Sequence, residues 1–335
     1  MPTFISRSRK TSDDLEAISS FIKQKQKNWK VLRSEFRNLG QMFENYLSAV
    51  EDPVKYISSR RYSVEAAGAF YFLYDSEARC VAYVDEFREL AESKLGGCPY
   101  CGLPRNITLD HFLPRKLNAF PEYSILSKNL VPACSGCQGK KSDYYHKLKR
   151  PLRIVRGARF KPKTKLIKDR KQCTYPFRVL RGNKNFGKLA PLRILHPYLD
   201  TFLKRPVLRI SPSADAEVFY VRACGSLTKF QRVQVEFHLK KLGVSSRSGG
   251  VVRSCRNAVI RDLSINKVRL DHASVKAELP RLLRSAIERA NMAVNAIEPA
   301  YIRSLISHSG TLDDLIEHAK TRAEPNVLAC AGVIL

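Results

Sequence analysis

The sequence predicts an α+β protein, with helical regions at both ends and a short strand-containing segment between them. Three observations favour this fold class. Apolar residues recur at helical spacing over much of the first hundred residues and again after about residue 228. Two Cys-x-x-Cys pairs enclose short apolar runs in the middle of the chain. Two further runs near residue 210 are rich in strand-forming residues, which is typical of β structure.

The N-terminal region, residues 1–97, is expected to be helical. Apolar side chains recur at helical spacing over Asp13–Ala49, with Ser12 as the capping residue, until Pro53 breaks the pattern. A second and long helix is predicted over Val64–Leu95, and the two glycines that follow would end it.

A basic arm is predicted at residues 148–193. From Lys147 to Arg193 there are seventeen Lys and Arg residues and a single acid, Asp169. Four prolines prevent a continuous helix there, so extended chain and loop are expected: Pro151, Pro162, Pro176 and Pro191.

The C-terminal region, residues 194–335, is predicted to contain a small β segment and then helices. Strands are expected at Val207–Ile210 and Glu217–Arg222. Helical patterns follow at Phe230–Leu242, Val252–Leu263, Val275–Ile297 and Leu312–Lys320.

The charge of the chain points to a polyanionic partner. Of the 335 residues, 59 are Lys or Arg and 31 are Asp or Glu, which leaves a net charge of +28. No apolar run approaches the roughly 20 residues needed to span a bilayer, and the N-terminus lacks an apolar signal core. We therefore expect a cytoplasmic, soluble protein that binds nucleic acid and no membrane. The oligomeric state is not readable from the sequence.

Nine cysteines, an odd number, make a disulfide framework a poor prediction and favour metal ligation for any paired set. Cys98 with Cys101 and Cys134 with Cys137 form two such pairs, 32 residues apart, and four thiolates are a standard shell for structural zinc. The remaining cysteines are expected to be small buried hydrophobic residues: Cys80, Cys173, Cys224, Cys255 and Cys330.

A second pattern lies between and after the cysteine pairs. Asp110-His111 precedes a hydrophobic-Pro-Arg step that ends at Arg115, and Asn129 begins an Asn-Leu-Val step. Gln138 directly follows the last cysteine, and two lysines come next. In order and spacing, these residues and the cysteines resemble the four-cysteine branch of the HNH nuclease family, over about 46 residues.

The resemblance implies a ββα-metal finger within residues 98–147. Its first strand would carry Asp110 and His111, and a long loop would lead to a second strand that begins near Asn129. A helix would run from about Ser135 to Lys147. Zinc on the four cysteines would hold this finger together, because so small a unit buries too little apolar surface to fold without metal.

The resemblance also implies the chemistry. His111 would be the general base, and Asp110 would bind one Mg²⁺ or Mn²⁺ ion. Asn129 would orient the histidine and brace the loop. Gln138 stands where the family usually has His or Asn, and its amide oxygen could complete the metal site. Substrate contacts are expected from Arg115, Lys140, Lys141 and His146.

The function predicted from these residues is metal-dependent hydrolysis of DNA by an endonuclease. Two alternatives remain open: cleavage of RNA such as tRNA by the same finger, and a catalytically silent nucleic-acid-binding module in a larger complex, which Gln138 favours. A zinc-ribbon transcription or replication factor would not need Asp110-His111 or Asn129.

A further likeness concerns the segment behind the finger. Leu195–Asp200, the two expected strands and the helix that ends in Leu-Gly-Val look like the tail of bacterial antiphage defence nucleases of the Septu type. This resemblance implies an ATPase partner protein.

Overall fold

The computed structural model describes residues 9–51, 62–95, 97–104, 106–142, 144, 193–213, 218–291 and 293–330. The chain forms two compact units, each treated separately below. Unit 1 comprises residues 1–5, 94–106 and 194–335, and unit 2 comprises residues 6–93 and 107–193. Helices and two small antiparallel sheets make up the described residues, so the protein is of the α+β class.

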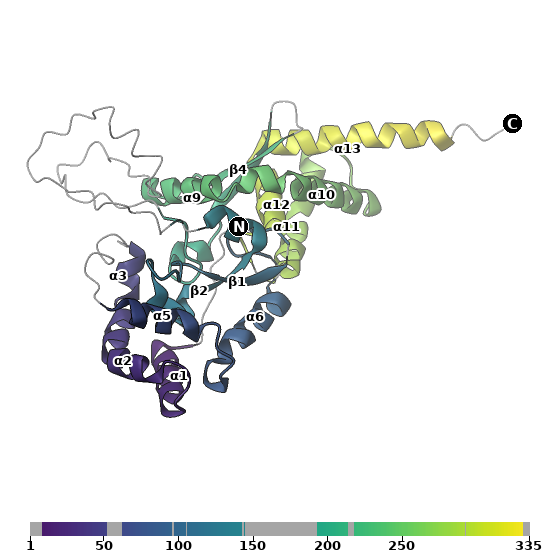
Figure 1. Cartoon of the computed structure of the whole chain (residues 1–335). Coiled ribbons are helices and arrows are strands. Elements are labelled where there is room, and N and C mark those ends of the chain that lie inside the picture. The colour runs from purple at the N-terminus through teal and green to yellow at the C-terminus, as the bar shows by residue number, and fades with distance from the viewer. Residues whose placement is uncertain are drawn as a thin grey trace, which may run out of the picture. The chain divides into compact units, whose positions relative to one another are not determined.

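Unit 2 begins with three helices, α1 (Thr11–Lys23), α2 (Trp29–Glu44) and α3 (Tyr46–Glu51), and Figure 1 shows α1 and α2 side by side. Two residues between α1 and α2 have φ in the left-handed region, Lys25 at 51° and Asn28 at 64°. Ser12 lies inside α1 and not at its cap, because Lys10 is the N-cap residue and its backbone NH donates to Asp13.

The single long helix expected over Val64–Leu95 is wrong. The structure has α5 (Val64–Leu73), a 3-10 turn (Arg79–Val81) and α6 (Tyr83–Lys94). Ser63 caps α5 by accepting a hydrogen bond from the backbone NH of Ala66. The polar run Asp-Ser-Glu after Tyr74 has no apolar side chain to pack, and the chain turns there.

The strand–loop–strand–helix order expected in the middle of the chain is present in unit 2. Strands β1 (Ile107–His111) and β2 (Leu130–Cys134) are antiparallel and pair His111 with Leu130. Helix α7 (Ser135–Lys141) follows β2 directly. It ends six residues before the expected Lys147, because Ser142 takes a φ of 48°.

The loop between β1 and β2 contributes large side chains to the core of unit 2, where Tyr123 meets Phe43 and Tyr46. Six of these side chains are fully buried, which gives the end of β1 a rigid support: Phe112, Leu113, Phe120, Tyr123, Ile125 and Leu126. The basic arm expected at residues 148–193 lies almost wholly outside the described residues.

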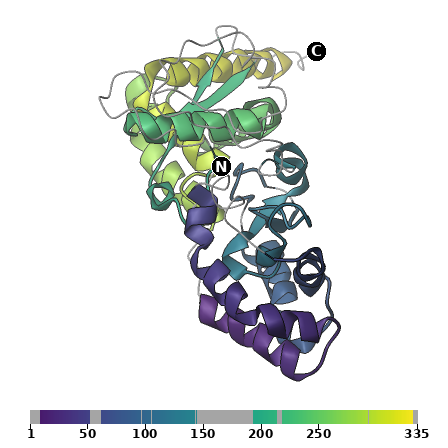
Figure 2. The same cartoon turned by 60° about the vertical axis from the view of Figure 1, so that its left-hand side comes forward.

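Unit 1 contains the second sheet, an antiparallel pair of β3 (Leu208–Pro212) and β4 (Phe219–Ala223), which confirms the two strands. Helices α9 (Lys229–Lys241) and α10 (Val244–Ile265) pack on β4. Helices α12 (Ile297–Ser307) and α13 (Ser309–Cys330) pack on β3 (Figure 2).

The helix expected over Val275–Ile297 ends eight residues earlier, at Arg289. Helix α11 (His272–Arg289) ends before Asn291, whose φ is 48°, and α12 starts at Ile297. Among the described residues, no helix is both long and apolar enough to cross a membrane.

Candidate metal centre and active site

The two cysteine pairs come together. Cys98, Cys101, Cys134 and Cys137 are buried, and their four Sγ atoms lie within 4.8 Å of one another. Cys134 is the last residue of β2 and Cys137 lies in the first turn of α7, so the strand-to-helix junction sets their spacing. Four thiol groups at this separation could bind a metal ion, and the arrangement is compatible with tetrahedral zinc.

The first cysteine pair sits in a tight turn. The backbone NH of Gly102 donates to the carbonyl oxygen of Cys98 at 2.6 Å, and the NH of Cys98 donates to the oxygen of Leu103 at 3.0 Å. Gly102 has a φ of 64°, a conformation that glycine adopts without strain. The turn therefore presents both thiols of the pair on one side.

A buried histidine that the sequence analysis did not single out braces this turn. The Nε2 atom of His238 lies 2.6 Å from the carbonyl oxygen of Tyr100, and its Nδ1 atom accepts from the backbone NH of Leu195 at 2.9 Å. Nε2 therefore carries the proton. Burial lowers the pKa of His238 to about 4, so the ring is neutral. No local sequence signal marks it, because both partners are backbone atoms distant in sequence.

His111, the candidate base, is the last residue of β1. Its Nε2 atom lies 2.8 Å from the carbonyl oxygen of Ser124, which accepts a hydrogen bond and cannot donate one. The proton therefore sits on Nε2, and Nδ1 keeps its lone pair. Burial lowers the pKa of His111 to about 3, with further lowering by the charges of Arg115 and Lys141. The ring meets Tyr74 edge-on, with centroids 4.4 Å apart.

Asp110 is paired with a lysine. The Nζ atom of Lys141 lies 3.1 Å from Oδ2 of Asp110 and 2.7 Å from the carbonyl oxygen of His111. The lysine side chain is 2% exposed and that of Asp110 is 15% exposed. Lys141 was expected to contact substrate, whereas its ammonium group is buried against these oxygens.

Gln138 lies one turn earlier on α7 and contacts a different residue of β1. Its Nε2 atom donates to Oγ1 of Thr108 at 2.6 Å and to the carbonyl oxygen of Ala133 at 3.0 Å. Gln138 and Asp110 were expected to share a divalent ion; the amide nitrogen of Gln138 is directed to Thr108 and Ala133, and Asp110 pairs with Lys141.

Asn129 holds the loop after β1. Its Oδ1 accepts from the backbone NH of Leu113 at 2.7 Å and from the hydroxyl of Tyr46 at 3.1 Å. Its Nδ2 donates to the carbonyl oxygens of Leu113 and Tyr123, both at 3.0 Å. The two hydrogen bonds to Leu113 join the two ends of the loop, and the other two hold it to Tyr46 and Tyr123. The orientation of His111 comes instead from Ser124.

Arg115 is also engaged by the protein. Its two terminal nitrogens donate to the carboxylate of Asp75 at 2.8 and 3.1 Å. Its guanidinium lies over the rings of Tyr71 and Tyr74, and Arg88 lies over the Tyr74 ring as well. These aromatic and acidic partners of Arg115 were not predicted from the sequence, although they lie at the end of α5 and in the polar run that follows it.

Two further residues were expected to contact substrate. Lys140 is exposed on α7, as that expectation requires. His146 lies outside the described residues, so the structure gives no position for it.

Comparison with known proteins adds no family assignment. The chain matches no family model, no curated protein and no solved structure.

Proposed function

We propose that this protein is a metal-dependent endonuclease of the HNH type that hydrolyses phosphodiester bonds in DNA. One observation carries the proposal: a neutral histidine of fixed tautomer, His111, lies next to a carboxylate, Asp110, that is positioned to attract a cation. Hydrolysis of a phosphodiester needs a base for the attacking water and positive charge for the departing oxygen.

The hydrogen bond from His111 to Ser124 leaves Nδ1 as the only ring atom able to accept a proton. A pKa of about 3 keeps this imidazole unprotonated at neutral pH, but it also makes the ring a weak base. Arg115 and Lys141 both lower that pKa through their charges. A phosphodiester anion beside these cations would offset their charges and raise the pKa of His111, so substrate binding would itself make the base stronger.

The residues around Asp110 are suited to a hard cation. Both carboxylate oxygens and the carbonyl oxygen of His111 already lie within 3.4 Å of the ammonium group of Lys141. Asp110 and the amide oxygen of Gln138 are the candidate ligands for Mg²⁺ or Mn²⁺. When bound, such an ion supplies the positive charge that stabilises the leaving oxygen. We propose zinc as the metal ion of the four cysteines.

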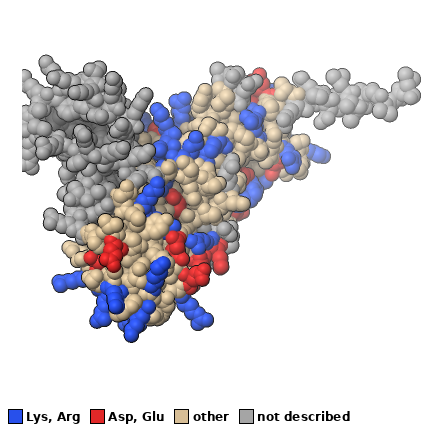
Figure 3. Space-filling model, in the orientation of Figure 1, with Lys and Arg blue, Asp and Glu red and all other residues tan. Residues whose placement is uncertain are grey.

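Basic surface supports the choice of nucleic acid as substrate. Figure 3 shows blue side chains over α9, where Lys229, Arg232 and Lys240 are exposed. Phosphate neutralisation by many Lys and Arg residues gives strong binding that weakens with salt. A role in antiphage defence and an ATPase partner remain proposals that rest on the sequence resemblance alone.

A second candidate function is a silent nucleic-acid-binding module. Two contacts favour it: Gln138 donates a hydrogen bond to Thr108, and the ammonium group of Lys141 already pairs with Asp110. In such a module the Asp110–Lys141 pair would be purely structural, and no divalent ion would be needed.

The test is incubation of the purified protein with supercoiled plasmid and Mg²⁺ or Mn²⁺ at low salt. We expect nicking or linearisation, and a rate loss of about 10²- to 10⁴-fold for His111→Ala, because the base is gone. His272→Ala, at an exposed position on α11, is the matched control and should cut normally. Cutting by His111→Ala at the full rate would contradict the assignment.

The same assay with labelled tRNA separates DNA from RNA as substrate. If neither polymer is cut, although wild type and His111→Ala bind both with equal affinity, the silent module is the correct function.

A further inference from the structure

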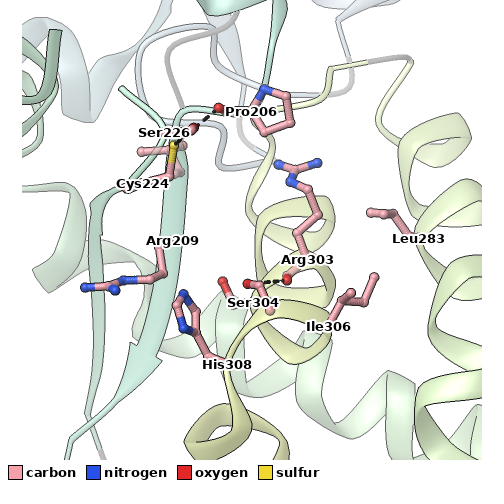
Figure 4. A pocket seen from close by; sticks show the side chains of 12 residues that line it. Pro206, Arg209, Cys224, Ser226, Leu283, Arg303, Ser304, Ile306 and His308 are labelled. Carbon is pink, nitrogen blue, oxygen red and sulfur yellow. Dashed lines mark hydrogen bonds between the residues drawn. The ribbon is translucent and has the colours of Figure 1, made fainter. Parts of the chain in front are cut away.

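Unit 1 contains a cavity of about 540 Å³ at the end of the β3–β4 hairpin, beside α11 and α12. The hairpin end contributes Leu208, Cys224 and Ser226, and the helices contribute Leu283, Arg303 and Ile306 (Figure 4). Cavities that bind small molecules typically have volumes of about 300–1,000 Å³. The sequence analysis expected Cys224 to be a buried core residue, whereas it is partly exposed in the wall of this cavity.

Arg303 is the main charged group of the cavity. It rises from α12 toward the hairpin end (Figure 4). One of its terminal nitrogens donates to the carbonyl oxygen of Val294. Its Nε atom is buried and makes no hydrogen bond within the described part of the chain. Burial lowers the pKa of Arg303 to about 10, and the interaction with Cys224 acts in the opposite direction.

Other arginines of the same unit have acidic partners. Arg256 pairs with Asp314 at 3.5 Å, and Arg289 pairs with Glu298 at 2.6 Å. Arg303 has no such carboxylate among the described residues. A largely buried cation without a counter-charge is costly, and a protein usually keeps one where an anion binds.

The other residues that line the cavity indicate which kind of anion would fit beside Arg303. Ser226 and His308 line the same cavity as Arg303, and the Ser226 hydroxyl lies 3.0 Å from the Cys224 sulfur. A guanidinium that shares a cavity with a hydroxyl and an imidazole can match the several oxygens of a phosphate. Leu208, Leu283 and Ile306 form apolar walls, and Ile306 is 40% exposed although it is a large apolar residue. Arg209 also lines the cavity, but its guanidinium is directed away from Arg303 (Figure 4).

We propose that this cavity binds a small phosphate monoester of nucleotide size, with Arg303 on the phosphate and the apolar walls against the organic part. The site is independent of the proposed nuclease chemistry, because every residue that forms it belongs to unit 1, whereas His111 and Asp110 belong to unit 2.

The test is titration calorimetry on the full chain with AMP, adenosine, inorganic phosphate and acetate. We expect AMP to bind, adenosine and acetate to bind at least about tenfold more weakly, and Arg303→Met to lose at least about tenfold in AMP affinity. Retained affinity for inorganic phosphate would identify the phosphate group alone as the ligand. His111→Ala should bind AMP normally, which separates this site from the nuclease site. No binding of AMP, equal binding of adenosine, or unchanged affinity in Arg303→Met would overturn the proposal.

A second variant protects the test against misfolding. Ile306→Glu places a carboxylate one helical turn from Arg303, at a position exposed enough to tolerate it, and should abolish AMP binding by occupying the guanidinium. Ile265→Glu, at a residue that is 71% exposed on α10, is the matched control and should bind AMP normally. Unchanged AMP affinity in a folded Ile306→Glu protein would also overturn the proposal.

Discussion

The ammonium group of Lys141 lies 3.1 Å from Oδ2 of Asp110 and 2.7 Å from the carbonyl oxygen of His111, so one buried lysine contacts both residues of the Asp-His pair. The contact connects α7 to the end of β1. It also places a fixed positive charge beside the candidate base, which the charge effect of Lys141 on the pKa of His111 reflects.

Replacement of this lysine should affect stability and activity together. Lys141→Met removes the ammonium group that pairs with Asp110, and we expect the free energy of unfolding to fall by about 2 kcal/mol, less than for a fully buried pair because Asp110 is partly exposed. Urea denaturation measures this loss. Lys140→Met, one residue earlier and exposed, should change the value by less than about 0.5 kcal/mol. Equal effects of the two variants would show that the Lys141 contact contributes nothing.

The cysteine cluster should separate metal binding from catalysis. Cys98→Ser removes one of four sulfur ligands, so we expect loss of zinc and unfolding of the segment around β1, β2 and α7. His111→Ala should retain its zinc. Metal content measured by atomic emission tests both, with Cys80→Ser as the control outside the cluster. If the two variants lost zinc equally, the division between structural and catalytic residues would be wrong.

Two histidines whose pKa values are lowered should make the protein sensitive to acid. Burial lowers the pKa of His111 to about 3 and that of His238 to about 4, both below the value of about 6.5 in an unfolded chain. Below pH 6.5 the unfolded chain therefore binds protons that the folded protein does not. The free energy of unfolding should therefore decrease as the pH is lowered below 6.5, by at most about 1.4 kcal/mol per pH unit for each histidine.

Urea denaturation between about pH 7.5 and pH 5 measures that slope. His238→Gln should reduce the slope, because one of the two groups is gone, and the exposed control His272→Gln should not. A slope identical in wild type and His238→Gln would mean that His238 titrates normally in the folded protein.

The ion pair between Asp75 and Arg115 should limit nucleic-acid binding. The Asp75 carboxylate occupies the two-nitrogen edge of Arg115 that a phosphate would use. Asp75→Asn should therefore raise the affinity for an oligonucleotide, by about two- to fivefold, because Asp75 is half exposed and the pair is screened. Fluorescence anisotropy measures the affinity. Glu77→Gln also removes one negative charge at a nearby position. An equal gain in affinity in that variant would show that the effect comes from net charge and not from release of Arg115.

Much of the fold and of the site was predicted from the spacing of residues in the sequence. Two Cys-x-x-Cys pairs and their 32-residue separation predicted the cluster, and apolar patterns located β3, β4 and most helices correctly. The breaks within helical regions, at Asn28 and after Tyr74, were not predictable, because hydrophobic periodicity continues across a turn that keeps the same buried face.

The sequence by itself determined which residue types this protein has for metal binding and for base chemistry, since those depend on chemical identity and short-range order. Only the tertiary structure decided which of them meet. Thr108 and Asp110 lie two residues apart on one face of β1, and Gln138 and Lys141 lie one turn apart on α7. The alignment of this helix with this strand brings Lys141 to Asp110 and Gln138 to Thr108. That alignment depends on packing between segments about thirty residues apart, which no local pattern encodes.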